Sequence, residues 1–362
     1  MYPDIIAIGI PFMIACVVIE FLYDMRRKKK NYRINAAISN ISCGIFEQVT
    51  GFISKGLFAL LYIYLYNTHR LYTIEDSLLV FIGLMLLVDL VFYGFHRLSH
   101  VCSVLWAGHV VHHEVEEFNL TVALRRSVMQ EFTIISVYLP FAVLGFSPAA
   151  FFLMFAAHNL YQFLIHTSYL PEFRTFGLIF NTPYHHEIHH ARNRCYVDKN
   201  FAGVLIIWDK MFGTFAKRTE TPEIGIGQET TTLNPVTAQI TTLARVFAEA
   251  KSKPSLRGKL VALFGPPSYL SKKSGAAADH AGTGREKFDP LISKASLQKA
   301  IMWFAFMLIT ITVYRNYETS LPLGVQLFAL AMVGGLLFYI GLILDNKVRA
   351  AEQADAASGT EV

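Results

Sequence analysis

The sequence predicts an all-α, polytopic integral membrane protein with about seven transmembrane or membrane-embedded helices and a cytoplasmic, histidine-rich helical cap. Three observations lead to this class. Of the 362 residues, 53% are hydrophobic and only 16% are charged, whereas about a quarter of a soluble domain is charged. Apolar stretches long enough for a membrane-crossing helix recur along the chain. Most of the 13 histidines gather in short clusters near these stretches.

Seven apolar stretches along the chain are the predicted membrane helices. They cover residues 5–23, 45–66, 78–95, 132–147, 148–165, 300–314 and 323–344. A run of five basic residues at 26–30 follows the first stretch, and an excess of Lys and Arg marks cytoplasmic loops. Alternation from that point predicts that residues 24–44, 96–131, 166–299 and the tail are cytoplasmic, with the loops 67–77 and 315–322 outside.

This order predicts five segments. They are N-terminal membrane helices with a basic loop (1–77), a histidine-box region (78–216), a cytoplasmic linker (217–297), C-terminal membrane helices (298–348) and a tail (349–362). Residues 251–290 are rich in Lys, Ser, Gly and Pro, so a loop without helical periodicity is expected there. The four cysteines lack close pairing, and the net charge of +5 is spread between apolar runs. Neither a disulfide framework nor a nucleic-acid partner is indicated.

Three histidine clusters carry the chemistry. The first, His96 to His100, continues the third apolar stretch, and two imidazoles four residues apart on a helix can hold one metal ion. The second (109–113, HVVHH) and the third (186–190, HEIHH) share one spacing. Gly108 is expected to end the preceding helix, so that the second cluster turns back toward the first. Thr182 and Pro183 predict a new helix at the third cluster.

These clusters supply eight candidate ligands, and His166, at the end of the fifth apolar stretch, is a ninth. The eight are His96, His100, His109, His112, His113, His186, His189 and His190. Eight imidazoles exceed the coordination of one ion, so two ions are expected. Neutral nitrogen donors suit Fe, Zn or Cu alike. A zinc transporter or metal store would also collect histidines, but it would place its ligands near the middle of the bilayer.

Nearby polar residues are candidates for supporting roles. Asp89 lies two turns before His96 on the same helix face, where a carboxylate is expected to orient a ligand histidine through its second ring nitrogen. His185 is expected to be a ligand or a hydrogen-bond donor beside the third cluster. His158 stands alone inside an apolar stretch, so packing or hydrogen bonding is expected there rather than metal ligation.

In their order and spacing, the clusters resemble the three histidine boxes of the fatty acid hydroxylase and sterol desaturase superfamily of membrane di-iron enzymes. The similarity spans roughly residues 78–216, which would form the catalytic domain, and is closest to the alkylglycerol monooxygenase-like branch. Its further motifs are WAGHVVHH from Trp106, NLTVALRRS from Asn119, NTPYHHEIHH from Asn181, DKN from Asp198 and GVLIIWDKMFGT from Gly203.

The resemblance implies that the nine histidines hold two iron ions and that O2 is a co-substrate. It implies an external donor of two electrons, either a reduced pterin or a reductase or cytochrome. Val101 stands where that branch is expected to carry an acidic residue for pterin use, which speaks against a pterin. Gln162 stands where hydroxylase relatives carry a histidine, so its amide is a ligand candidate. Asp209 is expected to anchor a ligand histidine.

The implied activity is hydroxylation of an unactivated C–H bond in a membrane lipid, with an ether-linked alkylglycerol as the leading substrate. Asn119 and Arg125 are expected to contact that substrate. Sterol or carotenoid hydroxylation or desaturation is the alternative, because the boxes do not determine the fate of the substrate radical. The enzyme is expected in the endoplasmic reticulum of a eukaryote or the inner membrane of a bacterium, with a cytoplasmic active site.

Overall fold

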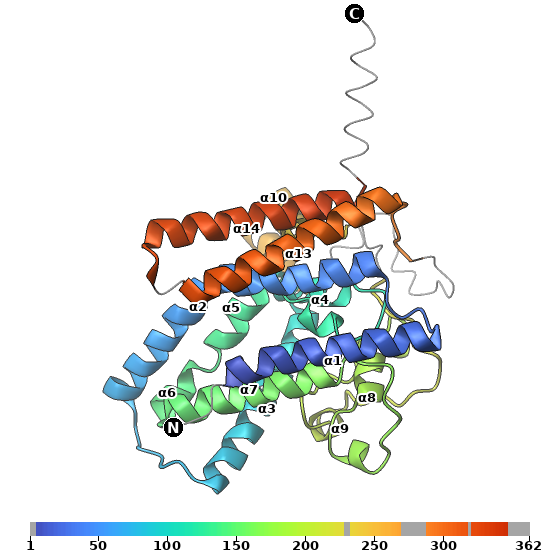
Figure 1. The fold of residues 1–362 in the computed structure, drawn as a ribbon. Helices are drawn as coiled ribbons and strands as arrows, with labels where there is room; N and C mark the ends of the chain where they lie inside the picture. Colours follow the sequence, from blue (N-terminus) through green and yellow to red (C-terminus); the bar gives the residue numbers. More distant parts are fainter. Residues whose placement is uncertain (1–4, 228–231, 269–286, 318–319, 347–362) are drawn as a thin grey trace, which may run out of the picture.

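The computed structural model describes residues 5–227, 232–268, 287–317 and 320–346, and the predicted tail at 349–362 lies outside them. Within the described residues the chain forms helices joined by loops (Figure 1). Extended pairing there is limited to two isolated bridges, Phe180 with Leu205 and Ala191 with Ile224. The prediction of an all-helical chain is confirmed for this part of the protein.

Three described helices are long and apolar enough to cross a membrane. They are α3 (Leu78–Val101), α13 (Lys294–Tyr317) and α14 (Leu323–Leu344). A fourth span is α2 (Ile34–His69) if its two halves, which meet at an angle of 50°, are counted as one. By length and composition, the described residues provide three or four spans, and the predicted total of about seven transmembrane or membrane-embedded helices is not confirmed.

The remaining apolar stretches take other forms. The first lies in α1 (Ile5–Arg27), which ends at the basic run. The two stretches between 132 and 165 are divided among α5 (Val128–Ser136), α6 (Leu139–Leu144) and α7 (Pro148–Leu164). Each of these three helices has fewer residues than the about 20 that a membrane-crossing helix needs. Composition alone could not distinguish such broken segments from complete spans.

The largest apolar core joins α2, α3 and α5–α7. Tyr62 of α2 stacks on Phe151 of α7 with ring centroids 4.7 Å apart, and Tyr138 donates its hydroxyl to the carbonyl of Val88 in α3. Within a bilayer, such close packing and interhelical hydrogen bonds hold helices together. The core therefore fixes α3, whose last turns carry His96 and His100, and α7, which is followed directly by His166.

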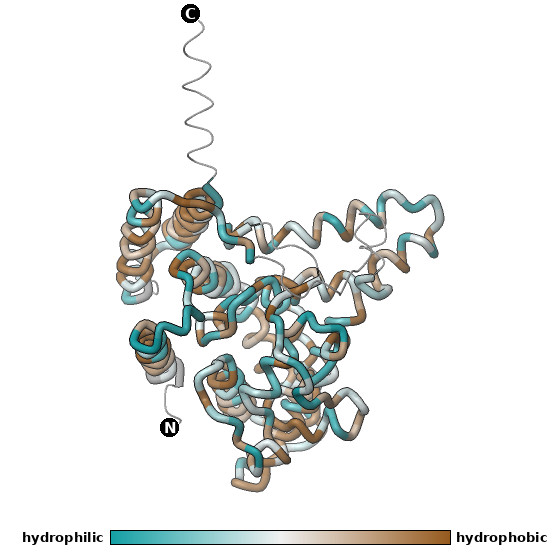
Figure 2. Tube along the Cα trace, turned by 90° about the vertical axis from the view of Figure 1, so that its right-hand side faces the viewer, coloured by the Kyte–Doolittle hydropathy of each residue, from teal (hydrophilic) through white to brown (hydrophobic). Residues whose placement is uncertain are grey.

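Hydrophobic residues recur along the long helices (Figure 2), and many of them are exposed on the outside of the protein. Ile19 on α1 and Phe328 on α14 are each 67% exposed. A large exposed apolar surface needs a cover, and lipid provides it around membrane-spanning helices.

The segment predicted as a linker contains two helices, α10 (Pro235–Ser252) and α11 (Leu256–Phe264). Asn234 caps α10 by accepting hydrogen bonds from two backbone N–H groups, and Ser255 caps α11. The expectation of a loop over 251–290 is therefore wrong for 256–264, whereas 269–286 lie outside the described residues. The Ser and Pro residues that suggested a loop form the caps and the turn between the helices.

Two short helices complete the histidine-rich end of the bundle, α4 (Ser103–His113) and α8 (Pro183–His189) (Figure 1). The chain turns at Cys102, with φ −121° and ψ 115°, and α4 folds back beside α3. Gly108 does not break the helix as expected; it lies inside α4, where a Cβ would come within 3.2 Å of the Gln130 nitrogen. The predicted start of α8 is confirmed, because Thr182 caps it and Pro183 is its first residue.

Candidate metal centre

Nine histidines form two adjacent groups at the ends of α3 and α7. In each group, every residue offers one ring nitrogen, and these nitrogens all lie within 4.8 Å of one another. The five-histidine group contains His96, His100, His109, His113 and His189, and the four-histidine group contains His112, His166, His186 and His190. The structure thus brings together all nine candidate ligands named from the sequence.

Each HxxHH cluster contributes to both groups. In the cluster at 109–113, His109 and His113 belong to the five-histidine group and His112 to the four-histidine group. In the cluster at 186–190, His186 and His190 belong to the four-histidine group and His189 to the five-histidine group. Residues four apart share a helix face, and the residue three positions along points about 60° away. The groups meet at His113 and His190, whose rings stack with centroids 4.4 Å apart.

Four of the nine rings have one nitrogen held by a backbone carbonyl. His96 Nδ1 lies 2.7 Å from the carbonyl oxygen of Phe201, and His112 Nδ1 lies 3.3 Å from that of Arg125. His166 Nδ1 lies 2.6 Å from the carbonyl oxygen of Gln162, and His189 Nδ1 lies 2.8 Å from that of Lys199. A carbonyl oxygen only accepts, so each Nδ1 carries the proton. In a neutral ring the Nε2 atom then presents a lone pair, which is the usual arrangement of a metal-ligating histidine.

These lone pairs point at one another. His112 Nε2 lies 3.1 Å from His166 Nε2, and no proton is left for a hydrogen bond between them. His186 Nε2 lies 2.9 Å from the same His166 atom. Buried ring nitrogens of His100 (Nε2), His186 (Nδ1) and His190 (Nδ1) have no hydrogen-bond partner. Buried polar atoms are rarely left so, and a cation between the rings would satisfy His100 Nε2 and the Nε2 atoms that face one another.

Burial keeps the rings neutral. Desolvation lowers the pKa of His189 to about 3 and the pKa values of His109 and His166 to about 4. Neutral imidazole is the form that binds a metal ion. The donor set therefore consists of nine neutral nitrogens, which fits a pair of borderline transition-metal ions such as Fe, Zn or Cu.

Asp89 does not contact either histidine group, so the expectation that it orients a ligand histidine is corrected. Its carboxylate accepts hydrogen bonds from the backbone nitrogens of Val204 and Leu205 and from Trp208 Nε1, and it lies 2.8 Å from His158 Nε2. A Cβ at Gly203 would come within 2.5 Å of His158, so the loop approaches this closely because glycine is present. Asp89 fixes the 203–208 loop, and His158 is hydrogen-bonded as expected.

Gln162 contacts the four-histidine group through its backbone. Its carbonyl accepts from His166, whereas its side-chain nitrogen lies 2.8 Å from His158 Nδ1. The side-chain nitrogen is thus engaged by His158, which belongs to neither group, and the role of the amide as a ligand stays a prediction. His185 also lies outside both groups, with its Nδ1 3.2 Å from the Thr182 hydroxyl.

Asp209 acts on a histidine only indirectly. Its carboxylate accepts from the backbone nitrogens of Phe201 and Ala202, at 2.8 Å each, and the carbonyl of Phe201 holds His96. Sequence reasoning did not identify Gln130, whose side-chain oxygen lies 3.0 Å from His109 Nδ1. The four backbone carbonyls that accept from ligand histidines could not be identified from the sequence either, because every residue has a backbone carbonyl.

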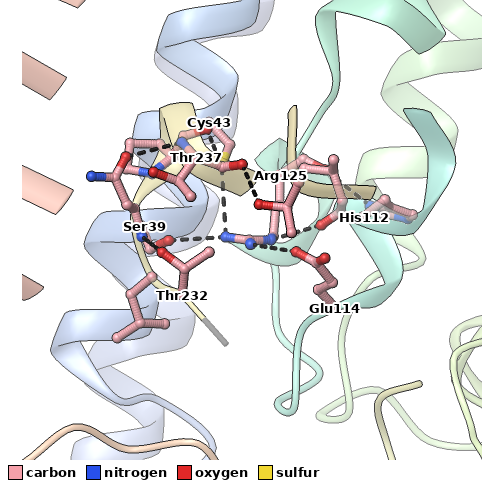
Figure 3. A network of polar contacts seen from close by, with 12 residues as sticks. Ser39, Cys43, His112, Glu114, Arg125, Thr232 and Thr237 are labelled. Carbon is pink, nitrogen blue, oxygen red and sulfur yellow. Dashed lines mark hydrogen bonds and ion pairs between the residues drawn. The ribbon is translucent and has the colours of Figure 1, made fainter. Parts of the chain in front are cut away.

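Arg125 is buried, with 2% of its surface exposed, and its guanidinium is fully engaged within the protein (Figure 3). It donates to the carbonyl of Val111 at 2.7 Å, to Ser39 at 2.9 Å and to Glu114 at 3.3 Å. Its own carbonyl holds His112. The expectation that Arg125 contacts substrate is corrected: it ties α2 to α4 beside the four-histidine group.

Asn119 is likewise 2% exposed and engaged. Its side-chain nitrogen donates to the carbonyl of Asn31 at 2.7 Å, and its oxygen accepts from the backbone nitrogen and hydroxyl of Thr121. It shapes the loop after α4, and its expected contact with substrate is also corrected.

The fold and the site together define a class: helical membrane proteins in which histidine boxes build two adjacent groups that could each hold a metal ion. Residues 81–214 match the family model for fatty acid hydroxylases. The chain is 32% identical over 356 residues to alkylglycerol monooxygenase of Homo sapiens, covering 96% of this chain and 80% of that protein. It is also 32% identical over 360 residues to alkylglycerol monooxygenase of Xenopus tropicalis, with 96% and 79% coverage.

A shorter match, 32% identical over 139 residues, relates 37% of this chain to 41% of an ornithine lipid hydroxylase of Rhizobium tropici. No solved structure matches the chain. The chain belongs to the fatty acid hydroxylase family. It is an integral membrane protein, and its relatives are monooxygenases and hydroxylases that support a lipid hydroxylase activity.

Proposed function

We propose that the chain is an O2-dependent di-iron monooxygenase that hydroxylates an alkylglycerol ether lipid. The observation that carries this proposal is the facing pair of His112 and His166, whose Nε2 lone pairs a cation between the rings would join. The identity with alkylglycerol monooxygenases over 96% of the chain supports the substrate class. Seven of the nine histidines are buried, and His100 and His112 are partly buried, which supports a resident metal site over weak metal binding at a surface.

Each histidine group would hold one iron ion. Two iron ions supply the oxidising power that no side chain has, using O2 and two electrons to convert a C–H bond into C–OH. The backbone carbonyls of Phe201, Arg125, Gln162 and Lys199 keep the ligand rings in the tautomer that presents Nε2. This shell orients the ligands before any metal arrives.

Aromatic side chains surround the two groups and limit the access of water. Trp106 lies 5.1 Å from the His100 ring, Phe201 lies 5.0 Å from the same ring, and Phe118 stacks on His166 at 5.9 Å. An apolar surrounding controls solvent access to a metal site and protects reactive intermediates.

The proposed reaction adds one oxygen atom of O2 to the ether carbon of the alkyl chain. The second oxygen atom leaves as water, and two electrons and two protons are consumed. The hydroxylated ether is a hemiacetal, which separates into an aldehyde and glycerol without further catalysis. We propose a reductase or cytochrome as the electron donor, because Val101 stands at the position expected to be acidic for pterin use.

The basic run at 26–30 supports a cytoplasmic location for the site. Glu20, near that end of α1, accepts hydrogen bonds from Thr167 and from the backbone of Leu120, close to the four-histidine group. By the positive-inside rule, this end of the bundle faces the cytoplasm. The host membrane would be the endoplasmic reticulum of a eukaryote or the inner membrane of a bacterium.

The test uses the full chain in lipid nanodiscs with a synthetic 1-O-alkylglycerol, O2, and either a reduced pterin or a reductase system. Trapping of the fatty aldehyde measures turnover. We expect aldehyde from the wild-type chain with the reductase system and none from His186→Ala, while His69→Ala, altered at an exposed site, stays active. An iron-loaded chain that forms no aldehyde with either donor would refute the proposed substrate.

A further inference from the structure

Helices α10 and α11 form a hairpin that projects sideways from the bundle (Figure 2). The view in this figure looks along the long helices, so the hairpin extends across their direction. One end of the hairpin is attached to α14, and the other end is attached to the junction of α3 and α4.

The first end is attached to α14. Asn234, the cap of α10, donates to the carbonyl of Phe338 at 2.9 Å, and Thr232 and the backbone of Leu233 donate to the carboxylate of Asp345. A Cβ at Gly341 would lie 2.3 Å from Asn234, so this glycine permits the close approach. These contacts lie within the last two turns of α14 and just beyond it.

The second end is attached to the junction of α3 and α4. Ser103 donates both its backbone nitrogen, at 2.9 Å, and its hydroxyl, at 2.7 Å, to the carbonyl of Gly265. Ser103 follows α3 by one residue. Both attachment points therefore lie at the ends of candidate membrane spans, where the surface of a bilayer is expected.

The hairpin exposes two apolar stripes. On α11, Leu256, Leu260 and Phe264, spaced four residues apart, are 73%, 47% and 58% exposed. On α10, Ile240 and Phe247, seven apart, are 59% and 53% exposed. Residues at these spacings share a helix face. No soluble helix is expected to present so many large apolar side chains to water.

Positive charge accompanies the stripes. Residues 235–268 contain five basic residues and one acidic residue, a net charge of 5 − 1 = +4. At about 100° per residue, Arg257 and Lys259 lie on either side of the leucine stripe of α11. Near the turn, Lys253, Ser255 and Arg257 line a cavity of about 300 Å³, together with Glu249, which pairs with Lys253. Anionic headgroups complement this arrangement.

We propose that the α10–α11 hairpin lies in the bilayer interface, with its apolar stripes among the upper acyl chains and its cations on the phosphates of anionic phospholipids. A helix with a basic rim and a Leu/Phe face characteristically takes this position, about 5–10 Å into the headgroup boundary. The hairpin thereby anchors α4, which carries His109, His112 and His113, to the membrane surface.

The test places one fluorescent label on the hairpin of the full chain. Leu260→Cys and, separately, Ile240→Cys are labelled with nitrobenzoxadiazole in a background whose native cysteines are replaced. The native Cys195, which is exposed in the loop after α8, serves as the matched control when it alone is restored. Each chain is reconstituted into phosphatidylcholine vesicles with and without phosphatidylglycerol.

We expect blue-shifted emission from both hairpin labels, with stronger quenching by lipids carrying a nitroxide near the headgroup than near the chain end. The Cys195 label should emit as in water. Phosphatidylglycerol should increase the quenching, and Arg257→Gln with Lys259→Gln should remove that increase. Hairpin labels that behave like the Cys195 label overturn the proposal. So do labels shielded from water but insensitive to lipid nitroxides, because a protein contact would then cover the stripes.

Discussion

His112 and His166 face each other through Nε2 atoms 3.1 Å apart, while a backbone carbonyl holds the Nδ1 proton of each ring. The carbonyls belong to Arg125 and Gln162, from two different parts of the chain. Two neutral rings in this arrangement bring lone pair against lone pair, and a cation between the two Nε2 atoms would relieve the repulsion. The proposed metal site is therefore indicated by the hydrogen bonds that fix the ring tautomers as well as by the histidines themselves.

Removing one of these two rings is predicted to empty one site. His166→Ala deletes a nitrogen from the four-histidine group and leaves the five-histidine group complete. Loss of a group that only hydrogen-bonds to a metal ligand lowers metal affinity about 10- to 100-fold, so loss of a ligand itself should lower it at least as much. Metal analysis of the purified variant should show half the wild-type content and no turnover. His69→Ala is the control, and equal metal content in His166→Ala would contradict the assignment.

Gln162→Ala is predicted to retain both metal ions. The substitution removes the amide that contacts His158 but keeps the backbone carbonyl that holds His166. Metal content should stay at the wild-type value, with at most a modest loss of activity from the altered contact of His158. A drop in metal content comparable to that of His166→Ala would instead make the amide a ligand, as its place in the sequence suggested.

Arg125→Met is predicted to destabilise the fold instead of weakening substrate binding. Breaking a buried ion pair by removing one partner costs about 3–5 kcal/mol, and here Arg125 donates to Glu114 and to two further groups. The midpoint of thermal unfolding should fall, and Arg125→Lys should recover only part of it because a single ammonium replaces a forked donor. A raised KM with an unchanged unfolding midpoint would restore the role in substrate binding.

The metal-free protein is predicted to lose stability as the pH falls. Burial lowers the pKa of His189 to about 3 and those of His109 and His166 to about 4, whereas an unfolded chain titrates near pH 6.5. Between about pH 6.5 and 4 the unfolded state therefore binds more protons, and each such ring costs about 1.4 kcal/mol per pH unit. Thermal unfolding of the chelator-treated chain from pH 8 to 4 checks this; a flat midpoint would show that the rings are not buried.

The candidate ligands were predictable because ligation imposes a side-chain type and a spacing. Histidines at i, i+3 and i+4 stand out in a sequence, and all nine lie together in the structure. How each cluster divides its histidines between the two groups was not predictable, because it depends on how α4 and α8 face each other. The turn at Cys102 sets the direction of α4, and no glycine or proline at that position indicates a turn in the sequence.

The supporting residues were harder to assign. Asp89 was expected to orient a ligand histidine and Arg125 to contact substrate, but the partners of Asp89 lie in a distant loop and those of Arg125 in and beside α2 and α4. Long-range contacts of this kind leave no periodicity in one sequence. Apolar length likewise did not reveal that residues 132–165, which hydropathy divides into two stretches, form the three shorter helices α5, α6 and α7.

Iron analysis of the purified full chain tests the two-site assignment most directly. The chain, produced in iron-supplied cells and isolated without chelators, should contain two iron ions per polypeptide, and Mössbauer spectra should show the ions in nitrogen-rich sites. The two groups provide nine nitrogen donors for them. A preparation that holds zinc in both sites, or one ion or fewer per active chain, would contradict the di-iron centre.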